Sequence, residues 1–235
     1  MHSALEPQPH NRMLHHQVLH HKMKDSFSSI YLTVLSVIQG VALADLASVV
    51  WSANKQFTFL QWLLVVSTFT MLIIIWDAYT QYSLLWVWVP NIWDAAIPFV
   101  IGSLELLLNH TIILSLSGWL FSLALISGMA ALANWHVRRQ ARKEAENTEM
   151  LTLLGNQTRW IIFSFVSSFA LLLLAIASRV GSLEVKEGIQ GIRGFLTLAL
   201  ILLVFGGLGI SEIMAIRSWD KVVTYARTGR MPPGR

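Results

Sequence analysis

The sequence predicts an all-α fold: a polytopic transmembrane helical bundle of about six spans, with both ends of the chain in the cytoplasm. Three observations predict it. Of the 235 residues, 54% are hydrophobic and only 13% are charged, whereas soluble globular chains are about 25% charged. Six apolar stretches have about the 20 residues that a spanning helix needs. Lys and Arg gather on one side of these stretches, as they do in cytoplasmic loops.

The apolar stretches divide the chain into five segments. The stretches are residues 27–51, 57–78, 87–108, 112–135, 160–178 and 192–216. The segments are a His-rich cytoplasmic tail (1–26), spans one to four (27–136), a basic and then acidic cytoplasmic linker (137–158), spans five and six (159–217) and a cytoplasmic tail (218–235). The sequence therefore predicts an integral membrane protein, which we expect in the plasma or inner membrane.

The first segment is rich in histidine. On a helix, His16 and His20 would share one face, where they could bind a metal or sense pH. Two ligands are too few for a metal site, so we expect an interfacial tail and no metal. Residues 42–44 (Ala-Leu-Ala) have the pattern of a signal-peptidase site, but the apolar run continues past them. We therefore expect the first span to be retained.

The third span contains two prolines. Pro90 stands near its start, where proline is tolerated, and Pro98 is expected to kink the helix. A re-entrant segment is the alternative, because broken backbone survives in a membrane where protein or water covers it. Only a short turn around Asn109 and His110 separates this span from the fourth. We therefore expect these two helices to be antiparallel neighbours.

The linker and the sixth span each allow two interpretations. The linker's basic run predicts that the fourth helix continues below the membrane as a solvated helix, and the alternative is a partner-binding segment. In the sixth span, Gly206, Gly207 and Gly209 precede Glu212. Small residues let helices pack closely. The alternative for these glycines is a constriction or hinge beside Glu212.

Orientation follows from the basic residues. With the N-terminus inside, the outer side holds only four of the 17 Lys and Arg residues, which are Lys55, Arg179, Lys186 and Arg193. The net charge of +4 suits a cytoplasmic rim that faces anionic lipid. Because the basic residues form no separate domain, we expect no nucleic-acid binding. The tryptophans, including the deeper Trp119, are interpreted as interfacial anchors.

Five acidic residues fall within the spans or at their edges, whereas Lys and Arg stand only at span ends. The acids are Asp45, Asp77, Asp94, Glu105 and Glu212. Intramembrane charges are costly and mark candidate functional sites. The direction of each span places Asp45 and Glu105 at an outer level. It places Asp94, Glu212 and the boundary residue Asp77 at an inner level.

The third span carries two of these acids on one face. Asp94 and Glu105 are eleven residues apart, which returns to nearly the same side of a helix and separates them by about 16 Å along its axis. Pro98 and Ile101 lie on the same stripe, which we expect to face the bundle interior. Gln39 adds a polar group near the middle of the first span.

Three functions are consistent with this pattern. The first is a cation or proton channel or transporter, expected to be homo-oligomeric, whose pathway residues are Asp45, Asp94, Glu105, Glu212 and Gln39. The alternative is a non-catalytic membrane subunit or scaffold with a membrane-protein partner. The third is an intramembrane enzyme that uses Asp94 with Glu212, or His136 with Asn134. The sequence has no nucleotide-binding loop, no zinc-protease motif and no cysteine, so we expect no enzyme activity and no cofactor.

Overall fold

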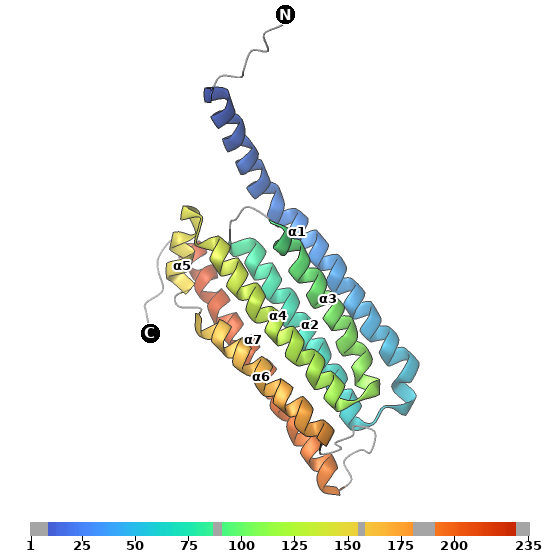
Figure 1. The fold of residues 1–235 in the computed structure, drawn as a ribbon. Coiled ribbons are helices and arrows are strands. Elements are labelled where there is room, and N and C mark those ends of the chain that lie inside the picture. The colour runs from blue at the N-terminus through green and yellow to red at the C-terminus, as the bar shows by residue number, and fades with distance from the viewer. Residues whose placement is uncertain (1–8, 87–90, 155–157, 181–190, 229–235) are drawn as a thin grey trace, which may run out of the picture.

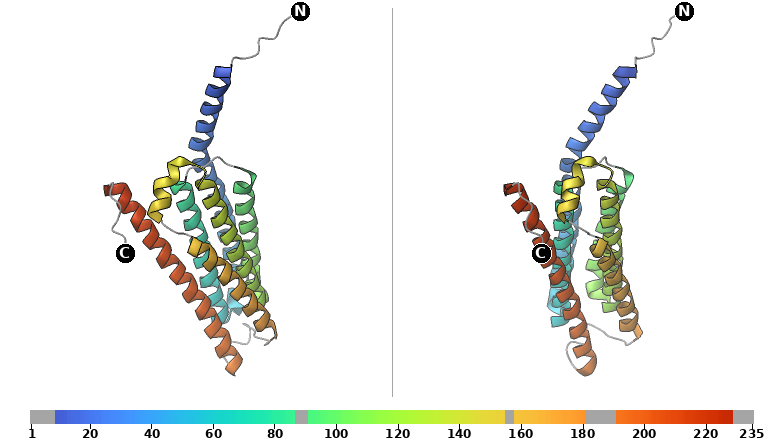
Figure 2. Two further views of the ribbon diagram at one scale, coloured as in Figure 1. Left: turned by 60° about the vertical axis from the view of Figure 1, so that its left-hand side comes forward. Right: turned by 90° about the vertical axis from the view of Figure 1, so that its left-hand side faces the viewer.

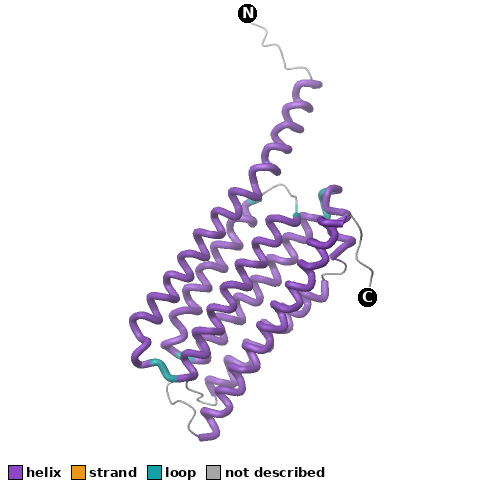
Figure 3. The backbone as a smooth tube through the Cα atoms, turned by 180° about the vertical axis from the view of Figure 1, so that it is seen from behind, coloured by secondary structure: helices purple, strands orange, loops and turns teal. Residues whose placement is uncertain are grey.

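The computed structural model describes residues 9–86, 91–154, 158–180 and 191–228, and these residues contain helices and no strand (Figure 3). The long helices are α1 (Pro9–Ala53), α2 (Phe59–Leu85), α3 (Ile92–Leu114), α4 (Leu116–Ala141), α6 (Thr158–Val180) and α7 (Gly191–Thr228). Three short helices join them: η1 (Asn54–Gln56), η2 (Ala145–Asn147) and α5 (Thr148–Leu154). The predicted all-α bundle is confirmed.

About six of these helices have the character of membrane spans. Five are long and apolar enough to cross a bilayer: α1 from Ser29 onward, α2, α3, α4 and α6. The sixth, α7, contains the shorter apolar stretch Gly194–Ile210. Large apolar side chains such as Phe69, Phe99 and Phe169 are about half exposed on the outside of the bundle. Apolar surface over so many helices requires lipid, and the chain is an integral membrane protein.

The six long helices form an open horseshoe rather than a closed ring. Neighbours pack in the order α7, α2, α1, α3, α4 and α6, and α2 also touches α3 (Figures 1 and 2). The two ends of this order, α6 and α7, are consecutive in the chain. The start of α1 and the end of α7 lie at the same end of the bundle, as an even number of spans requires. That this end is the cytoplasmic one stays a prediction.

The third span begins and ends later than the sequence predicts. Asn91 caps α3: its side chain accepts a hydrogen bond from the Trp93 N–H, while Asp94 accepts one from the Asn91 N–H. Such a reciprocal cap satisfies amides that the first helical turn leaves free. The helix then continues through Asn109 and His110, so the turn expected there is wrong. The turn lies instead at Ser115, whose hydroxyl accepts a hydrogen bond from the Gly118 N–H and caps α4.

The re-entrant alternative for this span is also wrong. Helix α3 is continuous over 23 residues with Pro98 inside it. Pro98 is buried on the face that α3 turns toward the bundle. Neighbouring helices can compensate for the backbone hydrogen bond that proline lacks. Pro90 lies outside the described residues.

Trp119 is a core residue and not an interfacial anchor. Its side chain is completely buried, and its indole Nε1–H donates a 2.9 Å hydrogen bond to the Thr68 hydroxyl. This bond joins α4 to α2. A buried tryptophan generally needs a partner for its N–H, and position in the sequence does not indicate whether one is present. The interfacial interpretation therefore fails for this residue.

The linker at 137–158 is largely helical over its described residues, in the end of α4, in η2 and in α5. Helix α4 carries the first basic residues, Arg138 and Arg139, to its end at Ala141. The Arg139 guanidinium lies 5.4 Å from the centre of the Trp135 ring. After η2, α5 packs against the end of α7. There a hydrogen bond to Glu149 raises the pKa of Tyr225, because the carboxylate favours the protonated phenol.

Helices α1 and α3 approach each other closely at Gly102. A Cβ atom at this position would stand 2.4 Å from Cγ2 of Ile38, whereas a Cβ atom at Gly206 would meet nothing within 4 Å. Glycine at position 102 therefore sets the distance between the two helices. The residues on either side of this contact include Gln39 and Glu105.

We predict that Gly102→Ala destabilises the protein and that Gly206→Ala does not. The first substitution overpacks the α1–α3 contact, at a cost of about 1–3 kcal/mol. The second replaces an exposed helical glycine with a better helix former. Thermal unfolding of the purified protein in detergent measures both. An equal loss of stability in the two variants would contradict this account of the α1–α3 contact.

Candidate functional site

One face of α3 carries polar residues through most of the membrane. Asp94, Glu105 and Asn109 are each at most 4% exposed, and Pro98 and Ile101 complete the buried stripe between them. The stripe predicted from the eleven-residue spacing therefore does face the interior. From Asp94 to His110, α3 rises about 24 Å, close to the roughly 30 Å of a bilayer's hydrocarbon core.

Glu105 and Gln39 form the centre of the site. The Gln39 side-chain amide donates a 2.8 Å hydrogen bond to Glu105 Oε1. Glu105 is 0% exposed, and its Oε2 has no hydrogen-bond partner among the described residues. The described residues also place no Lys or Arg against this carboxylate. A buried carboxyl group without a base is costly when ionised.

Asn109 links this centre to the outer end of the site. Its side-chain amide donates two 2.9 Å hydrogen bonds, to the Ala42 carbonyl and to Asp45 Oδ2. The other oxygen of Asp45 lies 3.4 Å from Nε2 of His110, a side chain that is 57% exposed. The outer end therefore runs from a buried amide through a carboxylate to an accessible imidazole.

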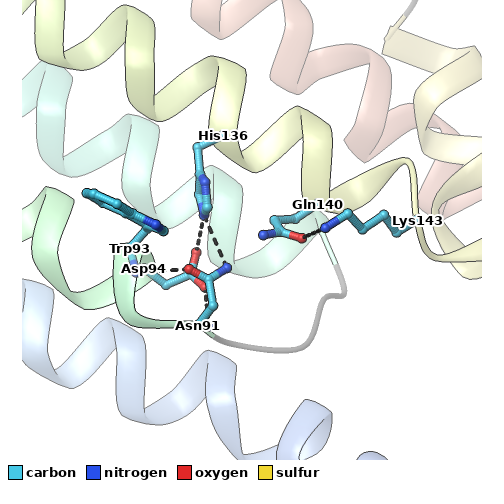
Figure 4. Close-up of polar contacts among 6 residues, drawn as sticks. All are labelled: Asn91, Trp93, Asp94, His136, Gln140 and Lys143. Carbon is cyan, nitrogen blue, oxygen red and sulfur yellow. Dashed lines mark hydrogen bonds and ion pairs between the residues drawn. The ribbon is translucent and has the colours of Figure 1, made fainter.

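The inner end pairs Asp94 with His136 of α4. Asp94 Oδ1 lies 3.0 Å from His136 Nε2, and Asp94 Oδ2 accepts the 2.7 Å hydrogen bond from the Asn91 N–H (Figure 4). The Asn91 side-chain nitrogen is 3.4 Å from the same imidazole nitrogen. Asp94 thus caps α3 and ties α3 to α4.

Two tyrosines occupy the interval between Asp94 and Glu105. Tyr31 lies in α1 and Tyr79 in α2. The two rings meet edge to face, with centroids 6.2 Å apart. Both side chains are buried, and the Tyr79 hydroxyl has no partner among the described residues.

We call these residues the polar track; close polar contacts join His136 to Asp94, Gln39 to Glu105, and Asn109 and His110 to Asp45. From the inner to the outer end it comprises His136, Asp94, Tyr31, Tyr79, Glu105, Gln39, Asn109, Asp45 and His110. Helices α1 to α3 supply all of it except His136.

The structure places the predicted pathway residues unequally. Gln39 and Glu105 are in direct contact, Asp45 belongs to the outer end, and Asp94 belongs to the inner end. Glu212 lies in α7, but its side chain is outside the described part of the chain, so the proposed Asp94–Glu212 acid pair stays a prediction.

Sequence reasoning missed both histidines as partners of the acids. From the sequence, His136 is paired only with Asn134 and His110 is placed in a turn. The antiparallel arrangement of α3 and α4 brings His136 to Asp94. The other residue of the suggested enzyme pair, Asn134, instead accepts a hydrogen bond from the Tyr82 hydroxyl. An expected turn at position 110 concealed the contact between His110 and Asp45.

A separate cavity lies between the two ends of the horseshoe. It has a volume of about 400 Å³ and is lined by residues of α2, α4, α6 and α7, with Ile101 of α3. Asp77 lines it and accepts a 2.6 Å hydrogen bond from the Gln81 side chain one turn later in α2. Asp77 therefore belongs to the cavity and not to the polar track.

Neither metal chemistry nor similarity to other proteins identifies the site. Within the described residues, no group of three or more His, Asp or Glu side chains could hold a metal ion. A comparison with family models, curated proteins and solved structures finds no match for the chain. The functional argument therefore rests on the geometry of the polar track.

We predict energetic coupling between Asp94 and His136. Asp94→Asn and His136→Gln each weaken a buried charge-assisted contact, which contributes about 1.5–3 kcal/mol. The double variant should lose less stability than the two single losses combined, because both remove the same interaction. Denaturant unfolding in detergent micelles measures the cycle. Lys143→Ala, which removes an exposed 2.8 Å hydrogen bond to Gln140, is the control and should change stability by less than about 0.5 kcal/mol. Strictly additive losses at Asp94 and His136 would contradict the pairing.

Proposed function

We propose that the protein carries protons across its membrane along the polar track, with Glu105 as the central proton-binding group. The observation that carries this proposal is a fully buried carboxyl group whose neighbours are Gln39 and Tyr79 rather than a base. An intramembrane carboxyl group without a basic partner is typical of proton relays. Its neutral form is inexpensive to bury, and its charged form is transient.

The unpartnered polar atoms of the track support a relay. Gln39 Oε1, Tyr79 Oη, Glu105 Oε2 and Asn109 Oδ1 are buried without a protein partner among the described residues. A buried polar atom that makes no hydrogen bond costs about 1–3 kcal/mol, and water molecules commonly satisfy such atoms. Water between these groups would complete a hydrogen-bonded path through the middle of the bundle.

The close approach of α1 and α3 favours a proton over a hydrated metal cation. Gly102 and Ile38 are in tight contact beside the Gln39–Glu105 pair. Interior packing of this kind leaves no passage for an ion with its water shell. A proton needs none, because it moves between hydrogen-bonded groups.

The two ends of the track suit proton uptake and release. His110 and His136 pair with Asp45 and Asp94 at opposite ends. Histidine is the side chain that most readily exchanges a proton near neutral pH. We infer that these pairs connect the buried Glu105 to the two aqueous phases. The plasma or inner membrane is the location we propose, with both chain ends in the cytoplasm.

We predict that the protein lets protons cross liposome membranes down an imposed pH or voltage gradient, so that the pH inside the liposomes changes. Glu105→Gln should reduce this proton flux at least about tenfold, because glutamine cannot accept and release a proton. Asp45→Asn and Asp94→Asn should reduce it as well. A fluorescent pH indicator inside the liposomes measures the rate, and replacing external K⁺ with Na⁺ should leave the rate unchanged.

One control and one further pathway variant make this test specific. The control, Glu146→Gln, is the same chemical change in the linker and should leave the flux intact. Glu212→Gln, which changes a predicted pathway residue whose side chain is outside the described geometry, tests whether α7 contributes. Unchanged flux in the Asp45, Asp94, Glu105 and Glu212 variants would overturn the pathway. No flux in the parent protein at any pH or voltage would favour the non-catalytic subunit.

A further inference from the structure

The cavity between the ends of the horseshoe has the dimensions of a small-molecule site. Its volume of about 400 Å³ falls within the roughly 300–1,000 Å³ of typical ligand pockets. None of the pathway residues predicted from the sequence is among the residues that line it. Tyr79 is the one member of the polar track that lines it, and the described residues at its charged end, Asp77 and Gln81, are not part of the track.

The two ends of the cavity differ in polarity. Asp77, Gln81 and Asn134 line the cavity and lie in the last third of α2 or α4, toward the end of the bundle where α1 starts and α7 ends. Leu171 and Leu174 of α6 line it farther from that end. The cavity is thus polar near one membrane face and apolar toward the middle of the bilayer.

The polar end carries a negative charge. Asp77 is the one charged residue among the described residues that line the cavity, and no Lys or Arg accompanies it there. In the described part of the chain, the Gln81 amide alone donates a hydrogen bond to it, at 2.6 Å. In surroundings of low dielectric constant, a carboxylate attracts a cation far more strongly than it does in water. An anionic headgroup would be repelled at the same place.

Small side chains widen the cavity along its length. Ala130 and Ala133 of α4 and Ser164 and Ser167 of α6 line this space. Their size leaves room for a chain of methylene groups beside α6 and α7. An apolar compartment with one charged end matches a molecule that has an apolar chain and one charged end.

We propose that this cavity binds a cationic amphiphile: a single hydrocarbon chain with an ammonium headgroup, the headgroup at Asp77 and the chain between α6 and α7. Charge complementarity selects the headgroup, and the leucine-lined compartment selects the chain.

Equilibrium dialysis with the full-length protein in phosphatidylcholine nanodiscs tests this site, with empty nanodiscs as the background. The probes are decylamine, decanol and decanoate, which share a chain length and differ in headgroup charge. Decylamine should bind saturably at one molecule per chain, decanol more weakly, and decanoate least. Asp77→Asn should weaken decylamine binding about tenfold, the size of one lost charge-assisted contact, and leave decanol binding unchanged.

A matched pair of substitutions locates the binding. Ala130→Phe fills the cavity and should abolish the saturable binding of decylamine and decanol. Ala177→Phe makes the same change at an exposed position of α6 outside the cavity and should have no effect. Equal binding of the three probes, which is what bulk partition into lipid would produce, overturns the proposal. The proposal is also overturned if the Asp77→Asn variant binds decylamine as tightly as the parent protein. This test does not depend on the Ala130→Phe variant, so it holds even if that variant fails to fold.

Discussion

The hydrogen bond between Gln39 and Glu105 is the interaction on which the centre of this membrane protein depends. A carboxyl group cannot be left in hydrocarbon without internal partners, and the Gln39 amide lies 2.8 Å from it. That distance requires α1 and α3 to pack closely, and Gly102 against Ile38 permits the approach. The polar pair and the small residue beside it therefore form one unit. Helix α1 carries the partner and α3 carries both the acid and the glycine.

The order in which the helices pack separates two polar systems. Helices α1, α2 and α3 carry most of the polar track at the centre of the horseshoe. Helices α6 and α7 form the two ends of the horseshoe and line the cavity. Tyr79 of α2 belongs to both, since it lies near Glu105 and also lines the cavity. One helix thus gives a structural route by which an occupied cavity can influence the track.

Charge is arranged along the membrane normal in a consistent way. The acids of the described spans are buried or partly buried between helices, each with a hydrogen-bond donor: Gln39, Asn109, Asn91 or Gln81. Basic side chains stand near the helix ends, as Arg138 and Arg139 do in the last turn of α4. Asp94 and Asp45 also lie beside the imidazoles of His136 and His110, whereas Glu105 and Asp77 accept hydrogen bonds from side-chain amides.

The sequence alone determined the membrane class, the approximate spans and the face that Asp94 and Glu105 share, because hydropathy and helical period are local properties of the chain. It did not determine where α3 begins and ends. Helix α3 starts after the cap at Asn91 and ends at the turn at Ser115. Asn109 and His110 are therefore inside the helix, where their side chains contact the Asp45 carboxylate. The tertiary structure alone decided that Trp119 is buried, that His136 meets Asp94 and that α6 and α7 stand at opposite ends of the packing order. The contacts of His136 and Trp119 join residues 42 or more positions apart in the chain. The packing order depends on which helices become neighbours, and no local pattern in a single sequence indicates such long-range contacts.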